Sequence, residues 1–293
     1  MKIAIIGSGV SGLVTAYLLS RKHEITIFEK ENHAGGHANT IAVTDSEKTY
    51  NLDVGFIVYN EKTYPKFTQL LNELNISTQL SDMSFSFSSV KENFEFSSRG
   101  LRGFFAQKKN ILNPIHYRML YDILSFQHDA RSVIKKNELN NSTFEEYLEN
   151  RNFSKAFRER LIIPLTAATW SNSPKDILRF PTNYLFRFLE QHGVLAANSI
   201  PEWRSIRDGS KTYIDAIINT IGENTFRFNT IVKKITRTIS GVTIHADNED
   251  QDFDAVVLAC HPDESLKILS DISTQERSIL SGFRYASNNV ILH

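Results

Sequence analysis

At 293 residues the chain can bury a substantial core in two lobes, and its 33 Lys and Arg residues balance 33 Asp and Glu residues, so no bulk charge points to nucleic acid. The single cysteine, Cys260, excludes an intramolecular disulfide and suits a reducing compartment. No run approaches the ~18 apolar residues that a membrane span needs, and the first strand leaves no room for a cleavable signal peptide, so we expect a cytoplasmic protein.

The chain opens with a strand and a glycine-rich turn. The apolar run Ile3–Ile6 lacks polar alternation and stops at a glycine, which predicts a buried parallel strand. The sequence GSGVSG follows at once. In it, Gly7 permits a tight turn, Gly9 lets the backbone approach a pyrophosphate, and Gly12 lets the next helix lie close to the strand.

A helix and a second strand complete this motif. The helix N-terminus would turn its free N–H groups, including those of Val10 and Ser11, toward phosphates. The strand Ile25–Phe28 closes on Glu29, about 20 residues beyond Gly7, where a carboxylate can accept both hydroxyls of an adenosine ribose. Its charge would repel a 2′-phosphate and disfavours NADP. A GxGxxG alone is a weak signal, but here a strand precedes it, a helix follows it and an acid lies at the expected distance, so the sequence predicts a dinucleotide site. The motif leaves open whether the ligand is FAD, NAD or another adenosine compound.

A second glycine pair, Gly35-Gly36, follows the acidic residue. Its backbone N–H groups would lie near the other side of a pyrophosphate, as a flavin dinucleotide threaded through the domain requires. The stretch from Glu29 and Lys30 to Gly36 and His37 resembles the FAD-dependent amine oxidases, protoporphyrinogen oxidase and phytoene desaturases, although His37 stands where the broad group has Arg. This resemblance implies FAD as the cofactor.

The resemblance is narrower than this broad group and covers essentially the whole chain. It is closest to predicted NAD/FAD-binding oxidoreductases associated with cyclopropane fatty acid synthases. It implies an α/β fold: a Rossmann-like FAD-binding domain of the GR2 type at 1–60 and 205–293, with an inserted α+β substrate lobe at 61–204. The segments that carry it are GGHANT at 35–40, DVGFIVYN at 53–60, ATWS at 168–171, HGVL at 192–195, Trp203 and DGSKTY at 208–213.

A predicted hairpin, 40–43 with 49–52, leads to Asp53, Gly55 and Phe56. In the resembling group the matching Asp-x-Gly segment passes the flavin, so Gly55 would allow close backbone approach there. The alternative is that Asp53 forms a turn and Gly55 a bulge.

The inserted lobe is rich in aromatic residues. Residues 63–74 predict a helix, and the alternating runs 84–88 and 93–97 predict a phenylalanine-lined hairpin that either roofs an apolar cavity or forms core. An amphipathic helical stretch is expected over 101–136. Its mixed basic and aromatic residues would either contact a bilayer surface or form a helical lid with a solvated basic face.

Further helices are expected in the rest of the lobe. Ser142 with Glu145 predicts a capping box, and a helix should run from Ser154 to Trp170. Another helix is expected over 184–192. The spacing of histidines marks no metal site.

The chain then returns to the nucleotide-binding lobe. Residues 208–210 should cap a helix over 211–221, and strands are expected over 230–235, 242–245 and 253–258. The resemblance places Val232, or its neighbour Ile231, against the adenine and Ala259 in the turn beneath the cofactor. Cys260 is expected to be a packing residue rather than a redox partner, because no second thiol exists. A final helix over 273–280 and a strand over 285–293 are expected. Because the resembling proteins continue into another flavin-contacting helix, we expect a C-terminally shortened form.

The resemblance implies a hydride transfer from a C–H bond of an apolar, lipid-like small molecule to the flavin. Flavin chemistry demands no acid–base pair of the protein, so no catalytic residue is named. An NAD-dependent dehydrogenase and a non-catalytic dinucleotide-binding scaffold are the alternatives. The candidates to face the flavin ring are Phe56, Tyr59, Asn60, Trp170 and Trp203.

Overall fold

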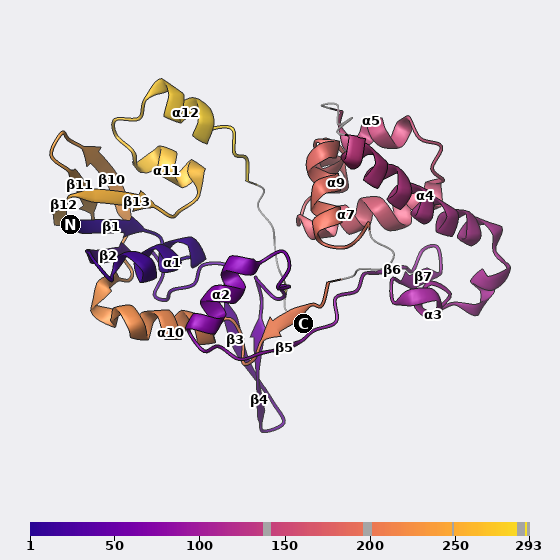
Figure 1. The fold of residues 1–293 in the computed structure, drawn as a ribbon, viewed down its shortest axis with the longest axis horizontal. Coiled ribbons are helices and arrows are strands. Elements are labelled where there is room, and N and C mark those ends of the chain that lie inside the picture. Colours follow the sequence, from indigo (N-terminus) through magenta and orange to yellow (C-terminus); the bar gives the residue numbers. More distant parts are fainter. Residues whose placement is uncertain (137–141, 196–200, 248, 286–290, 292–293) are drawn as a thin grey trace. The chain divides into compact units, whose positions relative to one another are not determined.

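The computed structural model describes residues 1–136, 142–195, 201–247, 249–285 and 291. The chain folds into two compact units, labelled by element in Figure 1. Unit 1 comprises Met1–Tyr59, Pro65–Leu80 and Arg204–His293, and unit 2 comprises Asn60–Tyr64 and Ser81–Trp203.

A parallel sheet with the order β13-β1-β2-β9 forms the centre of unit 1. Its first strand, β1, pairs in parallel with β13 on one side and β2 on the other, so the apolar run at 3–6 is buried and the prediction for it is confirmed. Helix α1 follows β1, as the glycine pattern predicted. The elements are β1 (Lys2–Ile6), α1 (Val10–Leu19), β2 (Glu24–Phe28), β9 (Phe226–Arg227) and β13 (Ala255–Leu258).

An antiparallel sheet of three strands packs with the parallel sheet in one apolar core. The ring of Phe28 meets that of Phe253 edge to face at 5.9 Å. The strand expected over 253–258 is divided at Asp254, whose carboxylate accepts the Lys2 backbone N–H at 2.7 Å. The strands are β10 (Val232–Arg237), β11 (Val242–Ala246) and β12 (Glu249–Phe253).

Residues 65–80 pack within unit 1, whereas the expected boundaries placed them in the inserted lobe. The cause is aromatic packing: the Phe67 ring lies 5.3 Å from that of Tyr59 and 5.4 Å from that of Tyr213. Strand β5 also pairs with β8. The remaining elements of this part are β3 (Thr40–Asp45), β4 (Lys48–Asp53), α2 (Pro65–Glu73), β5 (Thr78–Leu80), β8 (Arg204–Ile206), α10 (Lys211–Ile221) and the 3-10 helix η3 (Glu223–Thr225).

The described residues of unit 2 form a helical assembly with one hairpin, in which Phe87 pairs with Phe96. Phe94 and Phe96 lie in its core, so the hairpin phenylalanines serve packing. The described elements are β6 (Ser86–Ser89), β7 (Phe94–Ser97), α3 (Gly100–Phe104), the 3-10 helix η1 (Lys108–Leu112), α4 (Pro114–Lys136), α5 (Phe144–Glu149), α6 (Lys155–Phe157), the π-helix η2 (Arg158–Ile162), α7 (Ile163–Thr169), α8 (Pro174–Leu178) and α9 (Thr182–Gln191).

Two expectations for unit 2 need correction. The helical stretch over 101–136 is interrupted, because Asn113 takes the extended conformation that a following proline imposes, and Pro114 starts a new helix. The capping box lies one residue later than expected: Thr143 accepts the Glu146 N–H, and Glu146 accepts the Thr143 N–H. No described helix is long and apolar enough to cross a membrane.

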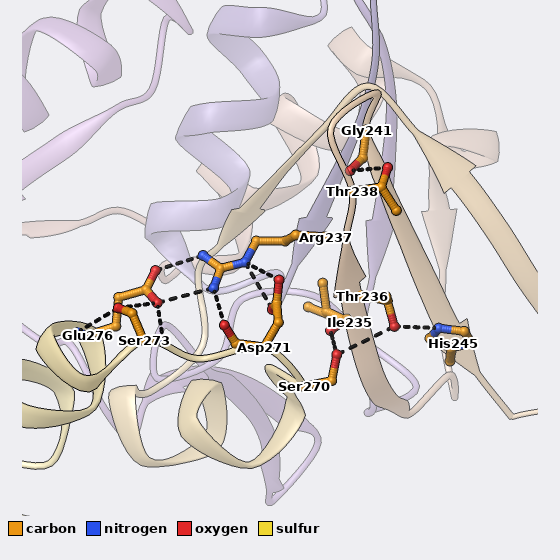
Figure 2. A network of polar contacts seen from close by, with 10 residues as sticks. All are labelled: Ile235, Thr236, Arg237, Thr238, Gly241, His245, Ser270, Asp271, Ser273 and Glu276. Carbon is orange, nitrogen blue, oxygen red and sulfur yellow. Dashed lines mark hydrogen bonds and ion pairs between the residues drawn. The ribbon is translucent and has the colours of Figure 1, made fainter.

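Two C-terminal helices, α11 (Pro262–Ile268) and α12 (Thr274–Leu280), complete the described part of unit 1. Figure 2 shows how Arg237 of β10 ties the segment between them, and the first turn of α12, to the sheet. Its guanidinium donates to Asp271 at 3.0 Å and to Glu276 at 2.6 and 3.1 Å. The strand expected over 285–293 lies, apart from residues 285 and 291, outside the described residues.

Candidate functional site

The turn between β1 and α1 requires two of its glycines for its own packing. Gly7 has a φ of +99°, and a Cβ there would lie 3.0 Å from the Ala259 carbonyl oxygen. A Cβ at Gly12 would lie 2.0 Å from the Gly7 carbonyl oxygen. Ala259 therefore lies directly behind the turn. Its own N–H donates to Ile6 at 2.9 Å, which fixes the turn against the end of the sheet.

Gly9 is different, because nothing in the described part of the protein requires a glycine there. Its φ of −62° is open to any residue, and a Cβ would meet no described atom within 4 Å. Gly9 is also the N-cap of α1, where it provides no side-chain hydrogen bond, and the first turn of α1 carries no acidic residue. Val10 and Ser11 begin the helix at this end. The space beside Gly9 and the positive end of the helix dipole fit an anionic group brought close to the backbone.

The Glu29 carboxylate is buried beside the same turn, with 8% of the residue exposed. Its Oε2 atom accepts the Ser8 N–H at 2.9 Å and the Ser8 hydroxyl at 2.5 Å, and its Oε1 atom accepts the Glu31 N–H at 3.0 Å. The carboxylate is therefore held at the turn instead of extending into bulk solvent. Sequence reasoning missed Ser8, although a hydroxyl inside the glycine motif and an acid on the adjoining strand form a natural hydrogen-bonding pair.

The Glu29 backbone also brings the segment after β9 to the site. Its carbonyl accepts the Thr230 N–H at 2.9 Å, and its own N–H donates to Arg227 at 3.0 Å. Val232, two residues beyond Thr230, is buried, whereas Ile231 is exposed. Val232 thus lies in the same apolar core as Phe28, the residue that precedes the acid.

The second glycine pair lies directly against the first glycine turn. The Gly35 N–H donates to the Ser8 carbonyl at 2.9 Å, and Gly9 and Gly35 form an isolated parallel bridge. A Cβ at Gly36 would lie 3.1 Å from the Gly9 Cα atom. The first glycine turn and the second glycine pair are therefore in contact, and the exposed His37 follows directly after the pair.

Rings stack beside this meeting point. His37 and His261 lie 5.9 Å apart between ring centroids, at an interplanar angle of 14°. His261 in turn stacks on Tyr285 at 4.2 Å and 4°. His37 is thus in contact with the segment that follows β13 as well as with the glycine pair.

Asp53 and Gly55 form protein contacts at the end of β4. The Asp53 carboxylate accepts the Ser210 N–H at 2.8 Å, the Ser210 hydroxyl at 3.2 Å and the Thr40 hydroxyl at 2.6 Å. A Cβ at Gly55 would lie 1.9 Å from the His37 carbonyl oxygen. The Phe56 N–H donates to this oxygen at 3.2 Å. These contacts fix the end of β4 against His37. No pattern in the sequence around Ser210 or Thr40 indicated that they contact Asp53.

Charged and thiol groups at the edge of the site have ordinary protein partners. Lys30 pairs with Glu264 at 2.9 Å, which raises the pKa of the lysine and lowers that of the carboxyl group. Burial raises the pKa of the Cys260 thiol, whose sulfur lies 3.3 Å from the Ser265 hydroxyl. The sequence predicted a packing cysteine at this position.

The aromatic candidates are divided between the two units. Phe56 and the buried Tyr59 both pack against Phe67 in unit 1. In unit 2, Trp170 packs on Phe188 at 4.4 Å, and Trp203 stacks on His192 at 5.9 Å. Within the described ranges, no group of His, Cys, Asp and Glu side chains could hold a metal ion.

Comparison with sequence families gives a match over nearly the whole chain. Residues 10–292 match the family described as flavin containing amine oxidoreductase. Over 42 residues the chain is 55% identical to the 4,4'-diapophytoene desaturase (4,4'-diaponeurosporene-forming) of Staphylococcus aureus strain Newman, a stretch that makes up 14% of this chain and 8% of that protein.

Solved structures share the fold. Cyclohexylamine oxidase from Brevibacterium oxydans IH-35A matches with a TM-score of 0.71 at 17% identity, over 96% of this chain and 62% of that one. Wild-type putrescine oxidase bound to putrescine gives 0.68 at 17% identity, over 96% and 63%. A CLA-producing fatty acid isomerase from P. acnes gives 0.65 at 19% identity, over 95% and 63%. The chain spans less than two thirds of the length of each of these proteins.

Proposed function

This chain belongs to the flavin-containing amine oxidoreductase family, and from that membership we propose that it is an FAD-dependent oxidoreductase acting on an apolar small molecule. The resemblance noted in the sequence, the α/β fold and FAD as the family's cofactor all agree with the comparisons. The activity would be the transfer of a hydride from a substrate C–H bond.

The observation that carries the proposal is the empty space beside Gly9. The backbone conformation and the packing at position 9 would accept any amino acid, yet the residue is a glycine. It stands at the N-terminus of α1, where no side chain caps the helix. The diphosphate of FAD would lie there on the amides of Gly9, Val10 and Ser11. Glu29 would accept one ribose hydroxyl on its Oε1 atom, because a carboxylate offers about four acceptor positions and Ser8 and Glu31 occupy three of them.

The neighbouring segments would complete the cofactor site. Gly36 and His37 would approach the diphosphate from the side opposite α1, and the backbone at Val232 would lie along the adenine. Asp53 would act indirectly, by fixing Gly55 and Phe56 against His37. Lys30 would be held at the rim by Glu264, and Ala259 would support the turn from behind.

When bound, FAD supplies the electron-accepting ring, so the protein has to bind the cofactor, orient the substrate and exclude water. We assign substrate binding to unit 2, the inserted part of the chain. An apolar substrate is favoured by the desaturase relative and by the fatty acid isomerase among the structural neighbours, whose names concern polyene and fatty acyl molecules.

The proposal is tested by purifying the protein without added cofactor, recording its visible spectrum and identifying the nucleotide that acid releases. A flavin spectrum with FAD in the supernatant is expected. A colourless protein that binds NAD would instead identify a nicotinamide-dependent dehydrogenase, and a protein that binds neither would be a scaffold that retains only the fold.

A further inference from the structure

One segment of unit 2 is rich in exposed cations, of which Arg99 pairs with Asp82 of the preceding segment. Between Phe96 and Tyr121 the sequence contains five Arg and Lys residues and no Asp or Glu. All five are exposed. The next acid, Asp122, is buried and paired with Arg118 at 3.0 Å. The surface-forming cations are Arg99, Arg102, Lys108, Lys109 and Arg118.

The same stretch exposes large apolar side chains. Leu112 at the end of η1 is 89% exposed, Leu101 in α3 is 67% exposed, and Tyr121 in α4 is 63% exposed. Exposed apolar residues occur singly on most proteins, but here they occur together within three successive helices. The others are Ile111, Ile115, Tyr117 and Leu124.

Helix α4 turns an apolar side away from its own core. Met119, Phe126 and Ala130 are buried in unit 2, whereas Tyr117, Tyr121 and Leu124 are exposed and recur at the i, i+4, i+7 spacing of one helix face. Figure 1 shows α3 and α4 within the same part of the fold. The exposed residues are therefore not needed to close the described core of unit 2.

We propose that this basic-apolar face, comprising the cations and exposed apolar residues of α3, η1 and the first half of α4, docks on the surface of an anionic phospholipid bilayer. Charge complementarity selects this partner: apolar side chains enter the headgroup boundary while the surrounding cations attract anionic lipids. Arg102 and Lys108, which form no ion pair with the described residues, are available for this contact. The docking rests on unit 2 alone and does not depend on the cofactor site.

The full chain should float with vesicles made of equal parts phosphatidylcholine and phosphatidylglycerol, and should not float with phosphatidylcholine alone. Each basic residue near an anionic surface contributes a factor of about five in partitioning, so Arg102→Glu combined with Lys108→Glu should lower binding at least ~25-fold. The matched control, Lys22→Glu with Lys66→Glu, changes the net charge equally at exposed positions of unit 1 and should bind like the wild type.

The apolar contribution is tested separately. Leu112→Ser should lower vesicle binding about tenfold because the leucine no longer enters the headgroup region. Ile239→Ser, at an exposed turn of unit 1, should leave it unchanged. Far-UV circular dichroism should show every variant folded, since all the altered side chains are exposed. Vesicle binding that survives charge reversal, or that is equal without phosphatidylglycerol, would overturn the proposal. So would a wild-type dimer that Leu112→Ser converts to a monomer, because the face would then bind a second copy of the chain.

Discussion

The Oδ1 atom of Asp53 lies 2.8 Å from the backbone nitrogen of Ser210, which comes 157 residues later in the chain. Ser210 stands at the N-cap position of α10 but uses its hydroxyl to donate to the same carboxylate, instead of capping its own helix. Asp53 therefore supplies both the acceptor and the negative charge that the start of a helix favours. The end of β4 and the start of α10 are fixed together by this one side chain.

We expect Asp53→Asn to destabilise the protein by about 1–3 kcal/mol, because the amide turns a donor toward groups that are themselves donors. Chemical denaturation measures this free energy of unfolding. Asp45→Asn, at the exposed tip of the same hairpin, is the matched control and should change it by less than about 0.5 kcal/mol. Equal free energies of unfolding for the Asp53 and Asp45 variants would show that the hydrogen bonds of Asp53 do not stabilise the fold.

Gly9 and Gly12 should respond differently to an added side chain. Gly9→Val should abolish FAD binding while the protein stays folded, because the side chain enters space that no described atom occupies. Gly12→Ala should instead destabilise the fold by about 1–3 kcal/mol, since its Cβ would meet the Gly7 carbonyl. Flavin absorbance after desalting and thermal melts of the apo proteins separate the two effects. Full FAD affinity in Gly9→Val would place the cofactor elsewhere.

Glu29→Gln should weaken FAD binding by about tenfold or more, because a charge-assisted hydrogen bond to a ribose hydroxyl contributes about 1.5–3 kcal/mol. Isothermal titration of the apo protein with FAD measures the change. The variant loses the charge that repels a 2′-phosphate, so its preference against nucleotides carrying this group should also decline. Glu31→Gln, next to the site and exposed, is the control for charge alone. Unchanged affinity in Glu29→Gln would contradict a ribose-binding role.

Short-range patterns predicted the first motif well. The apolar run of β1, the glycines after it and the acid after β2 each depend on neighbouring residues, so the sequence was sufficient for them. The sequence did not reveal the contact between Ser8 and Glu29, by which the turn and the acid are hydrogen-bonded to each other.

The sequence did not predict some other features, for two reasons. Either two local arrangements fitted the same residues, or the contacting residue lies far away in the chain. The sequence STFEE fits a capping box in two registers, and the structure adopts the one starting at Thr143, which buries Phe144 and Leu148. The break before Pro114 was present in the sequence as a proline signal. By contrast, no local pattern links Asp53 with Ser210, a contact that holds the end of β4 to the start of α10. The place of Asp53 in the cofactor site stays a prediction.

Acid should destabilise the link between β10 and α12. The Arg237 guanidinium and the Ser273 N–H lower the pKa of Glu276 to about 2, whereas an unfolded glutamate titrates near ~4.3. A folded-state pKa below the unfolded one stabilises the protein above the unfolded pKa, and this stabilisation is lost as the pH falls toward the folded value. Wild type should therefore be more stable than Glu276→Gln at neutral pH, and the difference should shrink between pH ~4.3 and about 2. Denaturant titrations of both proteins across this range measure it, and a difference that stays constant with pH would mean that the Arg237 pair does not hold the carboxylate ionised.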